Sequence, residues 1–220
     1  MKKQFGSKLA RGIFLTKPGD ARFAAWLGLR RKFVVETMRW LSADECGDDR
    51  DLYDAHPATR QLVATLGGGE IVAGVRATIL NWREITPEKF MTLKMALNSP
   101  LKNQMQKLIK DDHILARWRT TAWDGGLVDL TRFCVRWVPR RRGRKIIIAR
   151  QKIQYARLAL ALIRLLKNNP RLNARSRAVG LTSPKFVEFL KKVNVDLRVV
   201  ALAGETVLVE LKFPARFLEK

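Results

Sequence analysis

Hydrophobic and polar positions repeat with two periods along this chain, and the changes of period mark its elements. From residue 20 to 41 apolar side chains recur at near-helical spacing, so we expect one or two helices after Asp20, a residue favoured at the N-cap. Two apolar runs follow at 61–66 and 70–80, separated by Gly67-Gly68-Gly69. Their β-forming residues and the glycine spacer predict a hairpin.

The middle of the chain continues with a helical pattern and then a strongly apolar run. The helical pattern spans 87–110 and is broken at Asn98-Ser99-Pro100, because proline interrupts a helix. Residues 127–138 are rich in apolar β-formers and predict a buried central strand. Pro139 ends that strand because proline cannot donate a hydrogen bond to the sheet.

The last third of the chain alternates between the two patterns. Apolar residues at helical spacing from 153 to 166 predict an amphipathic helix, and Ser183-Pro184 predicts the start of another, with the serine as N-cap. Residues 197–202 and 206–213 are predicted strands joined by a short turn. Strands interleaved with helices in both directions indicate an α/β domain with a mixed sheet.

Length and composition fit one folded unit. At 220 residues with 47% hydrophobic content, the chain can bury a substantial core, so we expect a single domain over 1–220. The basic residues 1–18 are expected to form a loose arm or a short edge strand, and their apolar run is too short for a signal peptide. The most apolar helix, 158–166, is too short to span a membrane.

The net charge of +23 is the most unusual feature of the composition. No acidic residue occurs between Asp129 and Glu188, whereas basic residues are frequent there. Such a chain suits an acidic partner, which could be nucleic acid, an anionic membrane or an acidic protein. Nucleic acid is disfavoured because the basic residues are interleaved with a core and few exposed aromatic residues are evident.

The cysteines and histidines argue against several kinds of site. Cys46 and Cys134 are too few for a disulfide framework, and Cys134 falls in the predicted buried strand, so we expect a reduced, cytoplasmic protein. His56 and His113 have no companion histidine or cysteine at metal-ligand spacing. The sequence therefore predicts neither a metal site nor a bound cofactor.

Two charged residues, Asp129 and Arg132, lie within the predicted central strand. An ionised group inside a sheet is tolerated only when it is paired and hydrogen-bonded, so both should face other charges in a cleft. After the strand, residues 140–145 form a basic glycine turn before the next helix. Free N–H groups at a helix start and clustered guanidiniums predict a cradle for a pyrophosphate or a phosphopantetheine arm.

A strand, a basic loop and a helix after an N-terminal helical region resemble the GNAT acyltransferase superfamily, whose loop pattern Arg140, Gly143 and Lys145 match in part. Within that fold, the chain is similar to the acyl-homoserine-lactone synthases, the autoinducer synthases of bacterial quorum sensing, over about residues 25–213. The resemblance implies a single three-layer GNAT-like domain with a mixed twisted sheet and helices on both faces. The matching positions are Arg30, Val34-Val35-Glu36, Trp40, Asp51, Asp54, Arg76, Asp129-Leu130-Thr131-Arg132-Phe133 and Leu181-Thr182-Ser183-Pro184.

The resemblance also implies a reaction and its residues. The implied reaction joins S-adenosylmethionine, a substrate rather than a cofactor, to an acyl thioester on acyl carrier protein or coenzyme A, and releases methylthioadenosine. Asp129, Arg132 and Phe133 are the expected catalytic residues. Asp129 is expected to take the amine proton, directly or through water, and backbone N–H groups near Phe133 to Val135 to hold the oxyanion. The expected S-adenosylmethionine pocket comprises Arg30, Phe33, Val34, Trp40, Asp51, Asp54 and Arg76. The thioester carrier is expected on Arg140, Arg142, Gly143, Arg144, Lys145 and Arg150.

The chain departs from the family pattern at three places, all of which bear on substrate identity. Val34 stands where the family has phenylalanine, and Asp129 replaces a glutamate, which is one methylene longer. The stretch 86–122 is longer than usual. Either Phe90 or Met105 therefore corresponds to a family phenylalanine in this stretch.

Structural roles compete with the functional ones. The charges at Arg76, Asp129 and Arg132 could form a purely structural ion-pair network, and Trp40 could belong to the core. The aspartates of the acidic, turn-rich segment 42–57 could be ordinary turn residues. The alternative function is a GNAT-type N-acyltransferase acting on a different amine, and a basic nucleic-acid-binding protein is a third.

Overall fold

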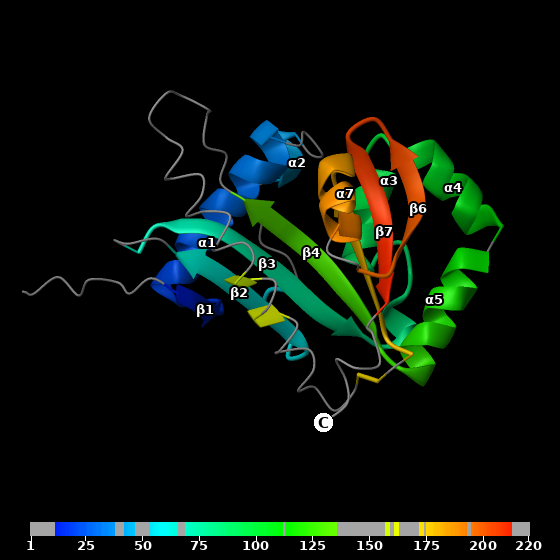
Figure 1. Ribbon diagram of the computed structural model, residues 1–220, viewed down its shortest axis with the longest axis horizontal. Coiled ribbons are helices and arrows are strands. Elements are labelled where there is room, and N and C mark those ends of the chain that lie inside the picture. Colours follow the sequence, from blue (N-terminus) through cyan, green and yellow to red (C-terminus); the bar gives the residue numbers. More distant parts are fainter. Residues whose placement is uncertain are drawn as a thin grey trace, which may run out of the picture.

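One seven-stranded sheet organises the molecule, with its strands in the order β1-β2-β3-β4-β5-β7-β6 (Figure 1). The computed structural model describes residues 12–37, 42–46, 53–65, 69–111, 113–135, 157–158, 161–162, 172–173, 175–192 and 195–212. The strands are β1 (Gly12–Thr16), β2 (Thr59–Thr65), β3 (Ile71–Leu80), β4 (Leu127–Val135), β5 (Arg177–Thr182), β6 (Leu197–Ala203) and β7 (Thr206–Lys212). Neighbouring strands are antiparallel except β4 and β5, which are parallel, so the sheet is mixed, as predicted.

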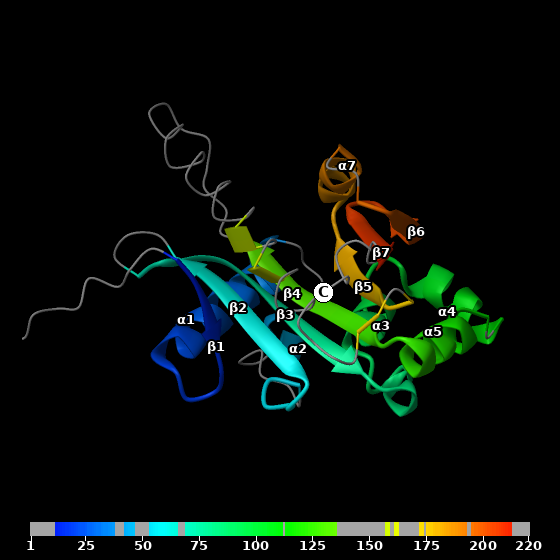
Figure 2. The same cartoon turned by 60° about the horizontal axis from the view of Figure 1, so that its bottom comes forward.

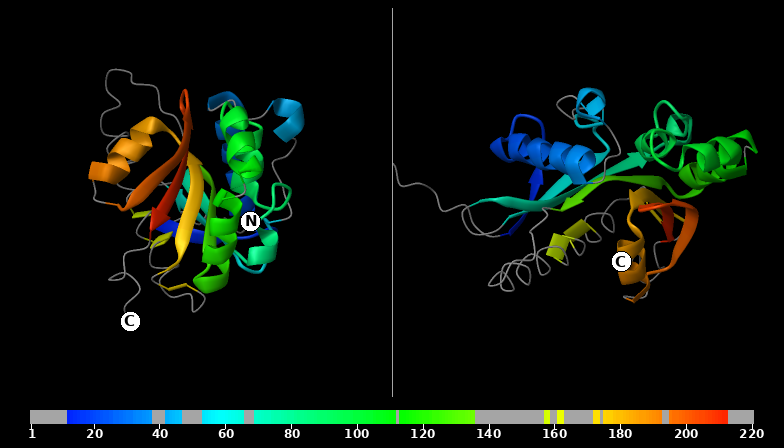
Figure 3. Two further views of the ribbon diagram at one scale, coloured as in Figure 1. Left: turned by 90° about the vertical axis from the view of Figure 1, so that its right-hand side faces the viewer. Right: turned by 90° about the horizontal axis from the view of Figure 1, so that it is seen from above.

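Helices cover both faces of this sheet (Figure 3). They are α1 (Ala21–Arg31), the π-helical turn η1 (Lys32–Thr37), α2 (Ala43–Cys46), the 3-10 turn η2 (Trp82–Glu84), α3 (Met91–Leu97), α4 (Lys102–Lys110), α5 (His113–Asp124) and α7 (Pro184–Lys192). One face carries α1 and α3 to α5, whereas α7 and the helical residues 157–158 and 161–162 lie on the other. The predicted three-layer α/β architecture is confirmed.

The predicted hairpin is formed by β2 and β3, which pair antiparallel from Thr59 opposite Thr78 to Thr65 opposite Ile71. Every residue of β3 is buried, because β3 lies between two strands and under helices on both faces. Arg76 is therefore completely buried, with an exposed fraction of 0%. A guanidinium at such a position requires charged or polar partners within the layer that covers it.

Helix α1 packs on β3 through residues at positions i, i+3, i+4 and i+7, namely Phe23, Trp26, Leu27 and Arg30. The indole of Trp26 reaches the sheet at Gly74, where a Cβ atom would lie 2.5 Å from a carbon of the Trp26 ring. Asp20 occupies the N-cap position, as predicted, but its carboxylate accepts a hydrogen bond from the backbone N–H of Lys17 instead of the helix. The helix is thus held mainly by its buried face.

We expect Gly74→Ala to lower the free energy of unfolding by about 1–3 kcal/mol, because the added methyl group must displace the Trp26 ring. Urea denaturation measures this change. Gly28→Ala is the matched control, since Gly28 is exposed on α1, the helix of Trp26, and nothing lies within 4 Å of its added Cβ. That substitution should raise the stability by about 0.5–1 kcal/mol, as in other helix interiors. Equal effects at the two glycines would contradict the packing described.

The predicted helical stretch is divided into α3 and α4 near Ser99, whose hydroxyl accepts a hydrogen bond from the N–H of Leu101 at 3.1 Å. Helix α5, the third helix of this group, was not predicted from the sequence. Together these helices enclose the largest apolar cluster, in which the rings of Phe90 and Trp118 meet edge to face at 5.3 Å between centroids. Phe90 and Met105, between which the sequence left a choice, are both fully buried there.

Several predicted boundaries are confirmed and others are corrected. Residues 12–16 form the edge strand β1, so the loose-arm alternative for 1–18 is wrong for these residues. The hydrophobic pattern did not predict strand β5, but the resemblance implies a strand-to-helix junction at 181–184, and β5 does end at Thr182 before α7. Of the predicted helix 153–166, the structure describes 157–158 and 161–162, which are helical, and the rest lies outside the described residues. The acidic segment 42–57, predicted to be irregular, contains the single helical turn α2.

The C-terminal part follows the sequence prediction closely. Helix α7 begins at Pro184, and the Ser183 hydroxyl accepts from the N–H of Phe186 at 3.4 Å, consistent with an N-cap. Strands β6 and β7 form the second predicted hairpin around Gly204, whose φ of +55° suits glycine. Within the described ranges, none of the helices has the length and apolar character that a membrane span requires.

Candidate active site

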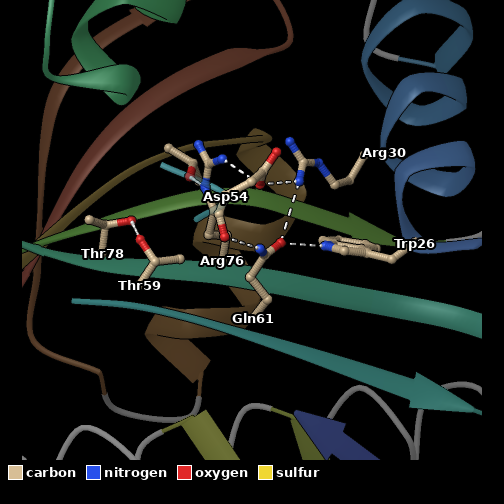
Figure 4. Close-up of polar contacts among 8 residues, drawn as sticks. Trp26, Arg30, Asp54, Thr59, Gln61, Arg76 and Thr78 are labelled. Atoms are coloured by element: carbon tan, nitrogen blue, oxygen red, sulfur yellow. Dashed lines mark hydrogen bonds and ion pairs between the residues drawn. The ribbon is translucent and has the colours of Figure 1, made fainter. Parts of the chain in front are cut away.

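A buried cluster of charges lies between α1 and the sheet (Figure 4). The Nη1 atoms of Arg30 and Arg76 approach the same carboxylate oxygen, Oδ1 of Asp54, at 2.7 and 3.0 Å. The exposed fractions are 0% for each arginine and 7% for Asp54, so water screens these contacts weakly. Charge-assisted hydrogen bonds of this kind are stronger than those between neutral groups. The cluster therefore holds together three segments that are distant in sequence.

Each member of the cluster reaches it from a different element. Arg30 is the last residue of the buried face of α1, at a position where the helical repeat would place an apolar side chain. Arg76 points from the middle of β3, and Asp54 lies on the loop before β2. A helix, a strand and a loop therefore converge on a charged centre at a place where apolar packing would be expected.

Gln61 of β2 completes the cluster. Its side-chain carbonyl accepts from the indole N–H of Trp26 at 3.0 Å and from Nη1 of Arg30 at 3.4 Å. Its amide nitrogen donates to the backbone carbonyl of Asp54 at 3.2 Å, which holds the loop in place. The guanidinium of Arg30 also lies over the Trp26 ring, 5.8 Å from its centroid. The positions of Arg30 and Asp54 are thus defined by several independent contacts.

Asp129 lies on the same face of the sheet as this cluster. In the β3–β4 ladder Arg76 is opposite Thr131 and Thr78 is opposite Asp129, so the four side chains share one face. Nε of Arg76 donates to Oγ1 of Thr131 at 2.9 Å, which ties the arginine to β4. Asp129 is 1% exposed and accepts a hydrogen bond from the hydroxyl of Thr92 on α3. A carboxylate is therefore buried diagonally across the ladder from a guanidinium.

Beside Asp129 the sheet opens. Strands β4 and β5 pair only over four positions, from Leu127 opposite Arg177 to Leu130 opposite Gly180. Strand β4 then continues to Val135 and β5 to Thr182, and Figure 2 shows the two strands diverging from their common start. Beyond Leu130, the backbone N–H and C=O groups on this side of β4 are not used by the β4–β5 ladder. Such groups can bind an extended ligand or an oxyanion.

The structure brings together part of the predicted site. Arg30, Asp54 and Arg76 meet, and Asp129 lies beside them as expected. Val34 is buried in the large apolar cluster, while Phe33 is half-buried against it. Arg132 and Phe133 belong to β4, but their side chains lie outside the described residues. The same is true of the predicted residues Trp40, Asp51, Arg140, Arg142, Gly143, Arg144, Lys145 and Arg150.

Three residues of this face were not identified from the sequence: Trp26, Gln61 and Thr92. Gln61 directly precedes the apolar residues Leu62, Val63 and Ala64, and Thr92 lies between Met91 and Leu93. A polar residue next to apolar ones is a weak signal, because such neighbours are common in strands and helices. The partners of Gln61 and Thr92 come from other elements, so the pairing becomes visible only in three dimensions. The described residues contain no group of three or more His, Cys, Asp or Glu side chains placed to hold a metal ion.

Comparisons with known proteins agree on the architecture. No protein-family model and no curated protein sequence matches the chain. Among solved structures, TofI in a ternary complex with an inhibitor and MTA is similar with a TM-score of 0.54 at 18% identity, covering 91% of this chain and 90% of TofI. The chain has a GNAT-like fold.

Two further structures extend this similarity. BjaI, a CoA-dependent acyl-homoserine lactone synthase solved with MTA, has a TM-score of 0.50 at 13% identity, covering 95% of this chain and 86% of BjaI. FeeM, an N-acyl amino acid synthase from uncultured soil microbes, has a TM-score of 0.51 at 10% identity, covering 94% and 93%. The GNAT-like fold thus extends over nearly the whole chain.

Proposed function

We propose that this protein is an acyl-homoserine-lactone synthase, which makes a quorum-sensing signal from S-adenosylmethionine and an acyl thioester. The observation that carries the proposal is the buried cluster of Arg30, Asp54 and Arg76 on the same sheet face as Asp129. S-adenosylmethionine carries an ammonium, a carboxylate and a sulfonium, so its pocket needs fixed charges of both signs. This face of the sheet supplies them at positions set by three elements.

The reaction has two steps. In the first, the methionyl amine attacks the thioester carbonyl carbon, a C–N bond forms, the C–S bond breaks and the carrier leaves as its thiolate. Asp129 takes the proton that the amine loses. In the second, the methionyl carboxylate attacks the side-chain carbon bonded to the sulfonium. A C–O bond closes the lactone, and methylthioadenosine leaves with the electron pair of the broken C–S bond.

The charge cluster suits the first substrate. The cluster holds two guanidiniums and one carboxylate at defined positions, and a guanidinium is well suited to bind a carboxylate. Asp129 supplies the negative charge that favours an ammonium or sulfonium. In the proposal Arg132, Trp40 and Asp51 extend this pocket, as the family resemblance implies, with Trp40 against the sulfonium or adenosine.

The region beyond the end of the β4–β5 ladder suits the second substrate. The ladder between these strands ends at Leu130 and Gly180, and we assign the thioester to the region beyond that pair. Backbone N–H groups of β4 there, near Phe133, would stabilise the negative charge that develops on the carbonyl oxygen. The basic residues 140–150 follow β4 directly and suit the phosphates of coenzyme A or the acidic surface of acyl carrier protein.

The fold comparisons support this assignment. TofI and BjaI have similar folds and were each solved with MTA, the methylthioadenosine that the proposed reaction releases. BjaI uses coenzyme A, so both carrier types stay within the proposal. The proposed location is the cytoplasm, where both substrates are made.

The test is product formation by the purified chain. We expect methylthioadenosine release that requires both S-adenosylmethionine and an acyl thioester, assayed with carrier-protein and coenzyme A thioesters of several chain lengths. Each substrate alone is the control. A folded protein that releases no methylthioadenosine with any thioester would contradict the proposal.

A GNAT-type N-acyltransferase acting on another amine is the second candidate, and the similarity to FeeM favours it. It uses the same first step but no sulfonium, so Asp129 would keep its role while the charge cluster would bind a different acceptor. Incubation with an acyl thioester and a panel of amines, followed by mass spectrometry, distinguishes the two. An acylated amine without lactone supports this candidate.

A further inference from the structure

Thr92 is a polar residue in a place where the packing calls for an apolar one. It is the second residue of α3, lies between Met91 and Leu93, and is 1% exposed. Its hydroxyl donates to Oδ1 of Asp129, which is itself 1% exposed and comes from β4, 37 positions further along the chain. The contact joins the helical layer to the carboxylate that the proposed reaction uses as its base.

The segment that carries Thr92 is also joined to the charge cluster. The hydroxyl of Tyr53, which precedes Asp54, donates to the backbone carbonyl of Lys89. Tyr53 is buried, with an exposed fraction of 1%, whereas Lys89 is exposed, so the bond lies at the edge of the buried region. The stretch from Lys89 to Thr92 therefore connects the loop of Asp54 to Asp129. A displacement of α3 would move both the base and the aspartate that pairs with two arginines.

We propose that Thr92 is a positioning residue for the acyl transfer, which sets the orientation of the Asp129 carboxylate toward the attacking amine. This inference rests on the proposed function. Thr92 acts through Asp129 and touches no substrate. By fixing Oδ1, its hydroxyl fixes the rotation of the carboxylate plane and hence the direction of the second oxygen, which takes the proton.

Two physical effects follow from the contact. A β-branched side chain in a helix has few χ1 states, so Thr92 presents its hydroxyl from a nearly fixed point. A hydroxyl that donates to a carboxylate also favours the ionised form, which is the form that can accept a proton. Loss of the hydroxyl would therefore loosen the base and make it more easily protonated.

A purely structural role for Thr92 predicts different results, and three variants separate the two. Thr92→Val keeps the shape and removes the donor, while Thr92→Ser keeps the donor. Thr120→Val is the matched control, because Thr120 is exposed on α5 and donates to its own helix at Ala116. We expect Thr92→Val to lower kcat by about 10-fold to 100-fold, as small misplacements of reacting groups do, with KM for S-adenosylmethionine nearly unchanged. Thr92→Ser should recover most of the rate.

The pH profile gives a readout that a structural role would not move. Among the described elements around Asp129, β3 contributes the charged side chain of Arg76, which is paired with Asp54 and, through it, with Arg30. Helix α3 contributes the exposed Lys94, and β5 contributes the apolar Val179. These neighbours are the same in the variants. Thr92→Val should therefore shift the acidic limb of kcat to higher pH, and Thr92→Ser should leave it in place.

A measurement without turnover keeps the inference separable from the proposed function. Carboxyl ¹³C NMR of the folded chain, with Asp129→Asn to assign the resonance, follows the ionisation of Asp129 directly. We expect its midpoint at higher pH in Thr92→Val than in the wild type and in Thr92→Ser. An unchanged midpoint together with unchanged kcat would overturn the role of Thr92. A wild-type chain that releases no methylthioadenosine while the midpoint still moves would overturn the function and leave the contact established.

Discussion

Asp129→Asn is expected to lower the rate of methylthioadenosine release by about 1,000-fold, because an amide cannot take the proton that the attacking amine loses. The substitution is nearly isosteric, and the hydroxyl of Thr92 can donate to the amide oxygen as it does to the carboxylate. The fold should therefore persist. Single-turnover kinetics at saturating substrate measure the rate, and circular dichroism measures the fold.

A matched control uses an aspartate far from this face. Asp196 precedes β6 and forms an exposed pair with Lys212 at 3.2 Å, so Asp196→Asn should leave the rate unchanged. A loss of less than about 10-fold in Asp129→Asn would remove Asp129 from proton transfer, since general base catalysis contributes more than that. Equal losses in both variants would indicate a general effect of charge.

Asp54→Ala is expected to lower the free energy of unfolding by about 3–5 kcal/mol, because it leaves two buried guanidiniums without the carboxylate that they share. Two positive charges then repel each other where water screens them weakly. The backbone position of Asp54 is also held by Gln61, so the loop itself keeps one anchor. Urea denaturation measures the change, and binding of S-adenosylmethionine should be lost in parallel.

The control is an ion pair on the surface. Lys32 and Glu36 approach to 3.8 Å with side chains 68% and 62% exposed, so Glu36→Gln should change stability by less than about 1 kcal/mol. If Asp54→Ala were no more destabilising than Glu36→Gln, the cluster could not be the buried, mutually dependent group described here. Substrate binding that survives in Asp54→Ala would show that the pocket lies elsewhere.

Elements with a strong local pattern could be predicted from the sequence. The β2–β3 hairpin and the break between α3 and α4 follow from glycine and proline, whose backbone preferences act locally. Helix α5 was not assigned, because its apolar residues are mixed with Arg117 and Arg119. Strand β5 is only six residues long and contains Gly180, so its sequence gives little β signal.

The candidate site could be predicted only in part, for a related reason. Arg30, Asp54 and Arg76 were named through their joint spacing, and the structure places them in contact. Gln61 and Thr92 depend on partners that are distant in sequence, and no local rule selects a glutamine or a threonine for such a contact. Sequence patterns indicate which face is buried, whereas the choice of hydrogen-bond partner is made by tertiary packing.

Mass spectrometry of the product formed from S-adenosylmethionine labelled with ¹³C throughout its methionyl group tests the central claim most directly. The reaction is run with the wild type and with Asp129→Asn, using the thioester that gives the highest turnover. The account predicts an acyl-homoserine lactone that carries the label, formed in equal amount with methylthioadenosine by the wild type alone. An unlabelled acyl amide, or labelled lactone made equally well by Asp129→Asn, would contradict it.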